Sequence, residues 1–366
     1  METESHRIVE VNLGERSYRA HISEGLIDRL GVLIKESLPG LTGCSVITSR
    51  PLQELFGQRV TESLEEIGIG FDFILVPDGE GSKTWEEAGR VLDLLLDLGL
   101  DRGSAVIALG GGSIGDLSAF VSSIYMRGVR LVQVPTTLLS QVDSCIGGKA
   151  AVNHPKGKNL IGAYHQPSLA VVDPALLETL PKEEFTSGLG EVVKYGVVAD
   201  PELFGILESS REGLIERRIP LLVEVIFRCL SIKARLVEMD ERDTKAHRAI
   251  LNYGHTVGHA VEHLTGMRHG EAVAFGMKVE ASISRSLGLL SRSHEERLLL
   301  LLGELGLRRN PSSLDPSAVL EAMKRDKKAE GGSIRLVLPT GIGAPPRLVK
   351  VSMEEITPHL EAHLHA

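Results

Sequence analysis

Short apolar runs alternate with amphipathic stretches along the first half of the chain. The apolar runs CSVITS, FDFILVP, SAVIALGGG, VRLVQVPTT and SLAVVDP begin at residues 44, 71, 104, 129 and 168. Between them, stretches such as LQELFGQRVTESLEEIG and TWEEAGRVLDLLLDLGLD have apolar residues at helical spacing. Because strands that alternate with helices form parallel sheets with helical crossovers, residues 1–182 are predicted to form an α/β domain. The simpler alternation over residues 7–22 predicts an edge hairpin.

The pattern changes in the second half of the chain. Segments such as RIPLLVEVIFRCLSIKARLVEMDERD and GEAVAFGMKVEASISRSLGLL have the length and apolar spacing of amphipathic helices. One later segment, SIRLVLPTGIG, fits a strand or an extended stretch. We therefore predict a second, mainly α-helical domain over residues 183–366.

Charge and cysteine content narrow the possible partners. The chain has 40 Lys and Arg residues against 49 Asp and Glu residues, a formal net charge of −9, which argues against a nucleic-acid-binding surface. Any anionic ligand must therefore be held by local cations. Three separated cysteines, Cys44, Cys145 and Cys229, form no disulfide framework and indicate a reducing compartment. The charged N-terminal segment and the lack of a window of about 20 apolar residues predict a cytoplasmic protein with no membrane contact.

A glycine-rich turn, VIALGGGSIGDLSAF, follows one predicted strand and precedes a predicted helix. Gly110, Gly112 and Gly115 match the GxGxxG pattern of Rossmann-like nucleotide-binding domains, in which the backbone approaches a pyrophosphate. The alternative is a tight turn that needs a positive φ at glycine. The acid that usually binds the ribose about 20 residues later is absent from residues 130–140, and Asp116 follows the last glycine directly.

Residues 135–167 combine hydroxyl, carboxylate, amide and ammonium groups in one segment. Ammonium groups pair with phosphate or carboxylate, and amides orient a ligand. The segment therefore favours a binding site for a polar, partly anionic ligand, although for any single lysine a solvated surface loop is the simpler explanation. The candidates are Thr136, Thr137, Asp143, Lys149, Asn153, Lys156, Lys158 and Asn159, with Arg127 just upstream.

Glu191 and Lys194 lie three residues apart in SGLGEVVKYG, so they share one face of a predicted helix. A surface ion pair is the simplest explanation of this spacing. The apolar neighbours Leu189, Val192 and Val193 instead indicate a buried setting. A buried carboxylate needs a partner, and a metal ion would be one.

Four histidines fall within LNYGHTVGHAVEHLTGMRHGE. His255 and His259 are four residues apart on one predicted helix, a spacing that favours a chelating pair for Zn²⁺ with a carboxylate as third ligand. His263 stands beside Glu262 near the helix end, where a packed or solvent-facing role is expected. Three protein ligands with an open position would make the site catalytic.

Together these motifs resemble those of the 3-dehydroquinate synthase family, within the sugar-phosphate cyclases. The resemblance runs nearly end to end. The strings that carry it are GGGSIGD, QVPTTLLSQVDSCIGGKAAVNHPKGKNLIGAYHQP, TLPKEEFTSGLGEVVKYG, NYGHTVGHAVE and HGEAVAFGM, whose order and spacing are specific.

The resemblance implies a homodimeric enzyme that depends on NAD and a divalent metal, Zn²⁺ or Co²⁺. It implies a small sugar phosphate as substrate: 3-deoxy-D-arabino-heptulosonate 7-phosphate would become 3-dehydroquinate and phosphate, in the shikimate pathway. One site would oxidise a ring hydroxyl with NAD⁺, eliminate phosphate, reduce the ketone, open the ring and close a carbocycle by aldol addition.

The metal ligands that the resemblance implies are Glu191, His255 and His269. This set differs from the His255–His259 pair that helical spacing favours. His259 would lie by the substrate phosphate as a candidate for proton transfer, and His263 has no assigned role. The link from His255 to His269 is shorter than in many relatives, so we expect a tight loop.

The resemblance also implies contacts to cofactor and substrate. Asp243 stands where the family generally has Glu, and the segment that follows it is one residue longer than usual. Arg127 would come from the neighbouring subunit, and Lys327 or Lys328 would complete the phosphate pocket. Cofactor contacts would be Asp78, Glu80, Lys83, Gly111, Gly112, Gly115, Asp116, Thr136, Thr137, Asp143, Lys149, Lys158, Leu176 and Thr179. Further substrate contacts would be Lys149, Asn159, Lys194, Lys233, Asp243, Arg248, Asn252 and His259.

The same motifs are compatible with three alternative functions. One is a sugar-phosphate cyclase that makes 2-deoxy-scyllo-inosose or 2-epi-5-epi-valiolone, whose substrates lack the carboxylate. Another is a metal-dependent polyol or alcohol dehydrogenase, which would release NADH. The third is a non-catalytic nucleotide-binding protein with a vestigial metal site.

Overall fold

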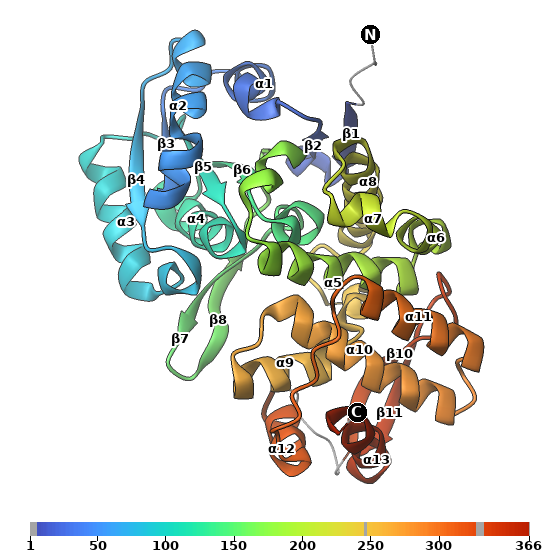
Figure 1. The fold of residues 1–366 in the computed structure, drawn as a ribbon. Coiled ribbons are helices and arrows are strands. Elements are labelled where there is room, and N and C mark those ends of the chain that lie inside the picture. The colour runs from blue at the N-terminus through green and yellow to red at the C-terminus, as the bar shows by residue number, and fades with distance from the viewer. Residues whose placement is uncertain (1–5, 245–246, 327–332, 366) are drawn as a thin grey trace. The chain divides into compact units, whose positions relative to one another are not determined.

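The computed structural model describes residues 6–244, 247–326 and 333–365, and the chain divides into two compact units (Figure 1). The first unit comprises the chain up to Leu180 together with Ile219–Arg242. The second comprises Pro181–Arg218 and the chain from Asp243 onward. Each unit is therefore assembled from two separate stretches of sequence.

A seven-stranded sheet forms the centre of the first unit, with the strand order β1-β2-β9-β6-β5-β3-β4. β1 and β2 pair antiparallel at one edge, and all other neighbours pair parallel. The predicted hairpin and the five predicted strands are therefore confirmed. The strands are β1 (Arg7–Val11), β2 (Tyr18–Ile22), β3 (Cys44–Ser49), β4 (Phe71–Val76), β5 (Ala105–Gly110), β6 (Arg130–Pro135) and β9 (Leu169–Val172).

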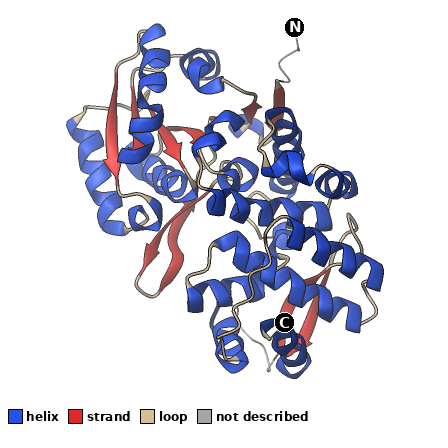
Figure 2. Ribbon diagram, in the orientation of Figure 1, coloured by secondary structure: helices blue, strands red, loops and turns tan. Residues whose placement is uncertain are grey.

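Helices cover both faces of this sheet (Figure 2). Val46 and Ile107 belong to the apolar core with α1 and α2, whereas Ile47 and Val106 belong to the core with α3 and α4. Strands buried on both faces read as continuous apolar runs, which is why the sequence identified them. The α/β, Rossmann-like class is confirmed. The helices are α1 (Leu30–Ser37), α2 (Arg50–Glu66), α3 (Trp85–Asp97) and α4 (Gly112–Ile124).

Helix α8 (Ile219–Met239) belongs to the first unit, although it lies within the range predicted for the helical domain. It packs beside β1, and the guanidinium of Arg7 donates a 3.2 Å hydrogen bond to Glu224 of α8. Helical spacing identified the element but not its packing partner, because an apolar helix face packs equally well on a sheet or on another helix.

A separate antiparallel hairpin, β7 (Lys149–His154) and β8 (Gly157–Tyr164), contains most of the polar segment noted in the sequence. Buried Ala150 and Val152 anchor β7 in the core that includes α4. The sequence did not predict this hairpin, because its many polar side chains conceal the alternation of a half-buried strand.

The second unit is mainly helical, as predicted. Helix α10 packs against α5, α9, α11 and α13. The strand predicted in SIRLVLPTGIG is confirmed as β10, whereas its antiparallel partner β11 was not predicted. No helix within the described ranges is long and apolar enough to cross a membrane. The elements are α5 (Lys182–Val198), α6 (Pro201–Ser209), α7 (Arg211–Ile215), α9 (His255–Thr265), α10 (His269–Ser286), α11 (Arg292–Glu304), α12 (Pro316–Asp326), β10 (Ser333–Leu338), β11 (Arg347–Ser352) and α13 (Met353–Leu364).

Short helical segments connect these elements and hold several predicted site residues. They are η1 (Gly14–Arg16), η2 (Leu26–Arg29), η3 (Gly79–Ser82), η4 (Tyr125–Arg127), η5 (Ser140–Ser144), η6 (Pro174–Thr179) and η7 (His247–Asn252).

Candidate active site

Close helix packing in the second unit brings Glu191 and His269 together. Glu191 lies on α5 next to Gly190, and His269 begins α10 next to Gly270. A Cβ added to Gly190 would overlap the carbonyl oxygen of Gly270, so the two helices approach to a distance that only glycine allows. The side chains that flank the two glycines are therefore neighbours although they are far apart in sequence.

The α9–α10 connection places the histidines. Helix α9 ends at Thr265, Gly266 adopts a left-handed conformation with φ of +68°, and α10 begins at His269. Glycine adopts this conformation without the penalty that other residues incur. The connection is short, as expected from the sequence, and it brings His269 back beside His255 and His259.

The carboxylate of Glu191 is the centre of this cluster. Its side chain is 1% exposed, and its Oε1 lies 3.4 Å from Nε2 of His255 and 3.4 Å from Nε2 of His269. Its Oε2 contacts the ammonium of Lys194, itself buried. Oε1 has no hydrogen-bond partner among the described residues. A buried anionic oxygen between two imidazole nitrogens fits a bound cation, because such an oxygen is costly to leave unpaired.

Electrostatics favour metal binding by two of these groups. Burial raises the pKa of Glu191, but the Lys194 ammonium and the imidazoles outweigh it and hold this pKa well below its usual range. Burial lowers the pKa of His255 to about 3, so its ring is neutral. For His269, burial is outweighed by the nearby carboxylates of Glu191 and Glu262, which raise its pKa to about 9. Ionised carboxylate and neutral imidazole are the forms that bind metals.

His259 lies in the same cluster. Ligand atoms of His255, His259 and His269 all lie within 4.8 Å of one another. The geometry thus offers two sets of three ligands that share His255 and His269 and differ in whether Glu191 or His259 is the third. The unpartnered Oε1 of Glu191 favours the set with the carboxylate. His263, on the same helix, is exposed.

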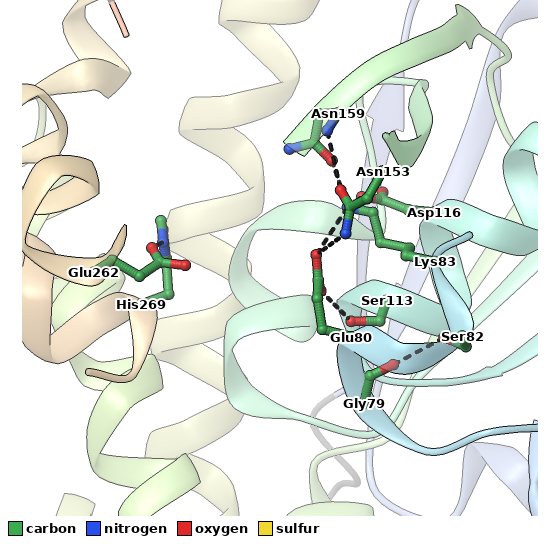
Figure 3. Close-up of polar contacts among 10 residues, drawn as sticks. All are labelled: Gly79, Glu80, Ser82, Lys83, Ser113, Asp116, Asn153, Asn159, Glu262 and His269. Atoms are coloured by element: carbon green, nitrogen blue, oxygen red, sulfur yellow. Dashed lines mark hydrogen bonds and ion pairs between the residues drawn. The ribbon is translucent and has the colours of Figure 1, made fainter. Parts of the chain in front are cut away.

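A polar cluster in the first unit joins η3, α4 and the β7–β8 hairpin (Figure 3). The Lys83 ammonium lies 2.7 Å from Oδ2 of Asp116 and 2.5 Å from Oδ1 of Asn159. Burial raises the pKa of Asp116, and the Lys83 charge opposes this shift. The sequence singled out all three residues, and the structure brings them into contact.

Glu80 forms the second half of this cluster. Its carboxylate accepts a 2.8 Å hydrogen bond from Ser113 and a 2.7 Å hydrogen bond from Nδ2 of Asn153. Burial raises the pKa of Glu80, but Lys83 and the two hydrogen bonds outweigh it and lower this pKa. Glu80 is therefore a fixed carboxylate beside the glycine-rich turn.

The glycine-rich turn joins β5 to the N-terminus of α4. Gly110, Gly112 and Gly115 all lack a positive φ, so the alternative explanation, a turn that needs a left-handed glycine, is wrong. Space explains the glycines instead: a Cβ added to Gly110 would lie 2.7 Å from the side chain of Ile114. A Cβ added to Gly111 would lie 3.0 Å from the side chain of Thr137. Thr136, the residue before Thr137, is buried.

Lys233 and Asp143 pair within the first unit. The Lys233 ammonium lies 3.1 Å from Oδ1 of Asp143 and donates a 2.7 Å hydrogen bond to the Asp143 carbonyl. The resemblance implies a substrate contact for Lys233 and a cofactor contact for Asp143, so these two expected contacts adjoin in the fold.

The remaining predicted residues lie in different settings. Leu176 is packed in the core of the first unit, and Arg248 is buried on η7, which ends at Asn252. Lys327 and Lys328 lie outside the described residues. The exposed residues of the predicted set are Asp78, Glu80, Arg127, Lys149, Lys156, Lys158, Asn159, Thr179 and Asp243.

The sequence did not predict two contacts of the site. Glu262 lies 2.9 Å from Nδ1 of His269 (Figure 3), and Ser113 holds Glu80. Glu262 precedes His269 by seven residues across a chain reversal, so helical spacing gave no sign of the contact. Only the acidic character of Glu262 in a histidine-rich stretch could have drawn attention to it.

Comparison with known proteins places the chain in a family. Models of the N-terminal and C-terminal domains of 3-dehydroquinate synthase match residues 73–187 and 188–329. The 3-dehydroquinate synthase of Thermodesulfovibrio yellowstonii is 47% identical over 351 residues, which cover 94% of this chain and 97% of that protein. The 3-dehydroquinate synthase of Desulforamulus reducens is 45% identical over 339 residues, which cover 92% of this chain and 94% of that protein. A solved structure of 2-epi-5-epi-valiolone synthase from Streptomyces hygroscopicus, with NAD⁺ and Zn²⁺ bound, is 28% identical with a TM-score of 0.87, covering 96% of this chain and 98% of that one. The chain belongs to the 3-dehydroquinate synthase family.

Proposed function

We propose that this enzyme converts 3-deoxy-D-arabino-heptulosonate 7-phosphate to 3-dehydroquinate and phosphate, with NAD and Zn²⁺ or Co²⁺. One observation carries the proposal: a buried carboxylate oxygen of Glu191 faces Nε2 of His255 and of His269. The near full-length match to relatives of this name supports it.

Glu191, His255 and His269 would hold the divalent metal. Bound there, the metal supplies positive charge that acidifies a substrate hydroxyl, and NAD⁺ supplies the hydride acceptor. The ammonium of Lys194 keeps Glu191 ionised and therefore able to bind a cation. His259 stands beside these ligands, where its imidazole would take up and return a proton as the phosphate leaves.

Nucleotide binding is assigned to the first unit. The N-terminus of α4 offers backbone N–H groups and positive potential to a pyrophosphate. Glu80, fixed by Ser113 and Asn153, would accept hydrogen bonds from the ribose hydroxyls, in place of the acid missing from residues 130–140. The other proposed cofactor contacts are Asp78, Lys83, Gly111, Gly112, Gly115, Asp116, Thr136, Thr137, Asp143, Lys149, Lys158, Leu176 and Thr179.

Local cations would bind the anionic substrate of a chain whose formal net charge is −9. Ammonium and guanidinium groups pair with phosphate and carboxylate, and amides orient hydroxyls. Arg248 and Asn252, together with the GKNLIGA string, favour a substrate with a carboxylate. The proposed substrate contacts are Lys149, Asn159, Lys194, Lys233, Asp243, Arg248, Asn252 and His259, with Lys327 or Lys328 at the phosphate.

The enzyme would act as a homodimer in which Arg127 reaches the neighbouring active site. Met126 and Arg127, which follow α4, both adopt positive φ and are both exposed. Exposed apolar side chains accompany them on this unit, among them Ile124 on α4 and Leu160 and Tyr164 on β8. Such side chains suit a protein interface. The three cysteines are free and buried, which suits action in the reducing cytoplasm.

Phosphate release tests the proposed reaction. Purified enzyme with NAD⁺ and Zn²⁺ should release phosphate from the heptulosonate phosphate with no net NADH at 340 nm, because the cofactor is regenerated in each turnover. No release from this substrate, with turnover of a sugar 6- or 7-phosphate that lacks the carboxylate, would instead assign a different cyclase. Stoichiometric NADH formation from a polyol would assign a dehydrogenase.

A further inference from the structure

Glu262 makes a direct contact with one of the proposed metal ligands. Its Oε2 lies 2.9 Å from Nδ1 of His269 (Figure 3). The Nε2 of the same ring lies 3.4 Å from Oε1 of Glu191. With Nδ1 donating to Glu262, the lone pair of Nε2 is directed toward Glu191. The contact therefore selects one tautomer and one ring orientation.

His255 is oriented in the same way but by a weaker partner. Its Nδ1 lies 3.0 Å from the backbone carbonyl oxygen of Tyr253, and its Nε2 also faces Glu191. A carbonyl carries no net charge, whereas a hydrogen bond to a carboxylate is charge-assisted and stronger. The two imidazoles therefore present the same nitrogen through partners of different strength.

The stronger partner supports the more exposed ring. The side chain of His269 is 29% exposed, whereas that of His255 is 12% exposed. His255 lies at the start of α9, where Gly254 donates a 2.7 Å backbone hydrogen bond to the buried Glu280. His269 begins α10 just after the chain reversal at Gly266, and its larger exposed fraction means that fewer neighbouring groups fix its ring.

Glu262 is itself held firmly. It lies in the last turn of α9, where its carbonyl oxygen accepts a 2.9 Å hydrogen bond from the backbone N–H of Gly266. Its side chain is 17% exposed. The carboxylate therefore projects from a capped helix end and not from a loose segment. A residue that orients another side chain must itself be fixed in this way.

We infer that Glu262 is a positioning residue of the metal site, which fixes His269 in the metal-binding orientation and makes its Nε2 a stronger donor. The inference rests on the metal site proposed above. Loss of such a partner typically weakens metal binding about 10- to 100-fold.

Metal affinity of the full-length protein tests this. Zn²⁺ affinity is measured by competition with a chelator of known affinity, and the Co²⁺ form is compared by its visible spectrum. Glu262→Gln keeps the size and an acceptor oxygen but removes the charge, so we expect about 10-fold weaker binding; Glu262→Ala, which removes both, should approach 100-fold. The Co²⁺ spectrum should change, since the donor strength of one ligand changes.

Glu184→Gln is the matched control. Glu184 pairs at 2.7 Å with Arg268, the residue before His269, and both side chains are exposed. This variant removes a nearby negative charge without touching the imidazole, so its affinity should stay within about 2-fold of the parent. A metal-free thermal melt of each variant shows whether the loss is one of folding.

The outcomes separate the two proposals. Parent-like Zn²⁺ affinity in both Glu262 variants would overturn the positioning role, and so would equal losses in Glu184→Gln and Glu262→Gln. A large drop in the melting temperature of the metal-free variants would also overturn it, in favour of a structural role. If the parent protein itself binds no Zn²⁺, the proposed metal site fails first, and no variant is needed to see it.

Discussion

Glu191 and Lys194 contact each other one turn apart on α5, and both side chains are almost completely buried. An i, i+3 ion pair on a helix usually lies at the surface, where it contributes little to stability. Here each charge depends on the other, because a single charge left in this interior would be poorly solvated. The pair therefore maintains an ionised carboxylate at a position where water is excluded.

We predict that Lys194→Met lowers the free energy of unfolding of the metal-free protein by about 3–5 kcal/mol, since it leaves Glu191 buried without its ammonium partner. Urea unfolding followed by circular dichroism measures the change. Lys324→Met is the matched control, because Lys324 and Glu321 form an exposed pair at the same spacing. The control should lose less than about 1 kcal/mol. Similar losses in the two variants would contradict the interpretation of a buried, mutually dependent pair.

Removal of metal should abolish activity. Dialysis against EDTA is expected to stop phosphate release, and Zn²⁺ or Co²⁺ should restore it. Metal bound only by the folded state also adds stability, about 2.7 kcal/mol when its concentration is 100 times the dissociation constant. The melting temperature should therefore rise with Zn²⁺ concentration. Full activity in protein that is metal-free by elemental analysis would contradict the proposal.

His259 and His269 should respond differently to alanine substitution. His269→Ala removes a ligand, so the purified variant should lose metal along with activity. His259→Ala removes a proton carrier, so the variant should keep about one metal per chain and lose rate. Metal content by elemental analysis and phosphate release, measured on the same preparations, separate the two. Metal loss in His259→Ala alone would favour the alternative set in which His259 replaces Glu191.

The sheet could be predicted from sequence because its strands are buried on both faces and read as apolar runs. The β7–β8 hairpin could not, since polar side chains such as Lys158 and Asn159 interrupt the alternation. Burial of Glu191 followed from its apolar neighbours. Its distance to His269 could not be derived locally, because it depends on the approach of α5 to α10 at Gly190 and Gly270.

The helical spacing within α9 and the tertiary contacts of α9 select different metal ligands. The spacing of His255 and His259 favoured them as a pair, and their ligand atoms do lie close together. The additional proximity of His269 results from the reversal at Gly266, which no periodic pattern encodes. Resemblance supplied His269 as a candidate, and the unpartnered oxygen of Glu191 gives a physical reason for it.

Acid should weaken the packing of α13 on α10. Burial, followed by the charge of Lys278 and the neighbouring His359, lowers the pKa of His363 to about 4, from an ordinary value of 6.5. Between these two values the unfolded chain binds a proton that the folded chain does not. The contribution of neutral His363 to the free energy of unfolding is therefore fully present above about pH 6.5. This contribution, about 2 kcal/mol for a partly exposed group, is lost as the pH drops toward 4.

His363→Gln provides the test of this pH dependence. The variant should show a flatter dependence of melting temperature on pH between about 4 and 6.5 than the parent protein. Above pH 7 the two curves should run parallel, because neither His363 nor its replacement is charged there. An unchanged slope in the acid range would exclude His363 as the titrating group.

The proposed role of Arg127 in the neighbouring active site can be tested by activity measurements on a heterodimer. If each active site uses its own His259 and the partner's Arg127, a heterodimer of Arg127→Ala and His259→Ala contains one site with both defects and one with none. Coexpression with two different affinity tags and tandem purification isolates this heterodimer, which should have about half the activity of the parent dimer, because subunits of a symmetric dimer exchange equivalent residues. Both homodimeric variants should be nearly inactive. If Arg127 instead serves the site of its own chain, every site in the heterodimer carries one defect and activity stays at the level of the single variants. Failure to recover any doubly tagged species would argue against the dimer itself.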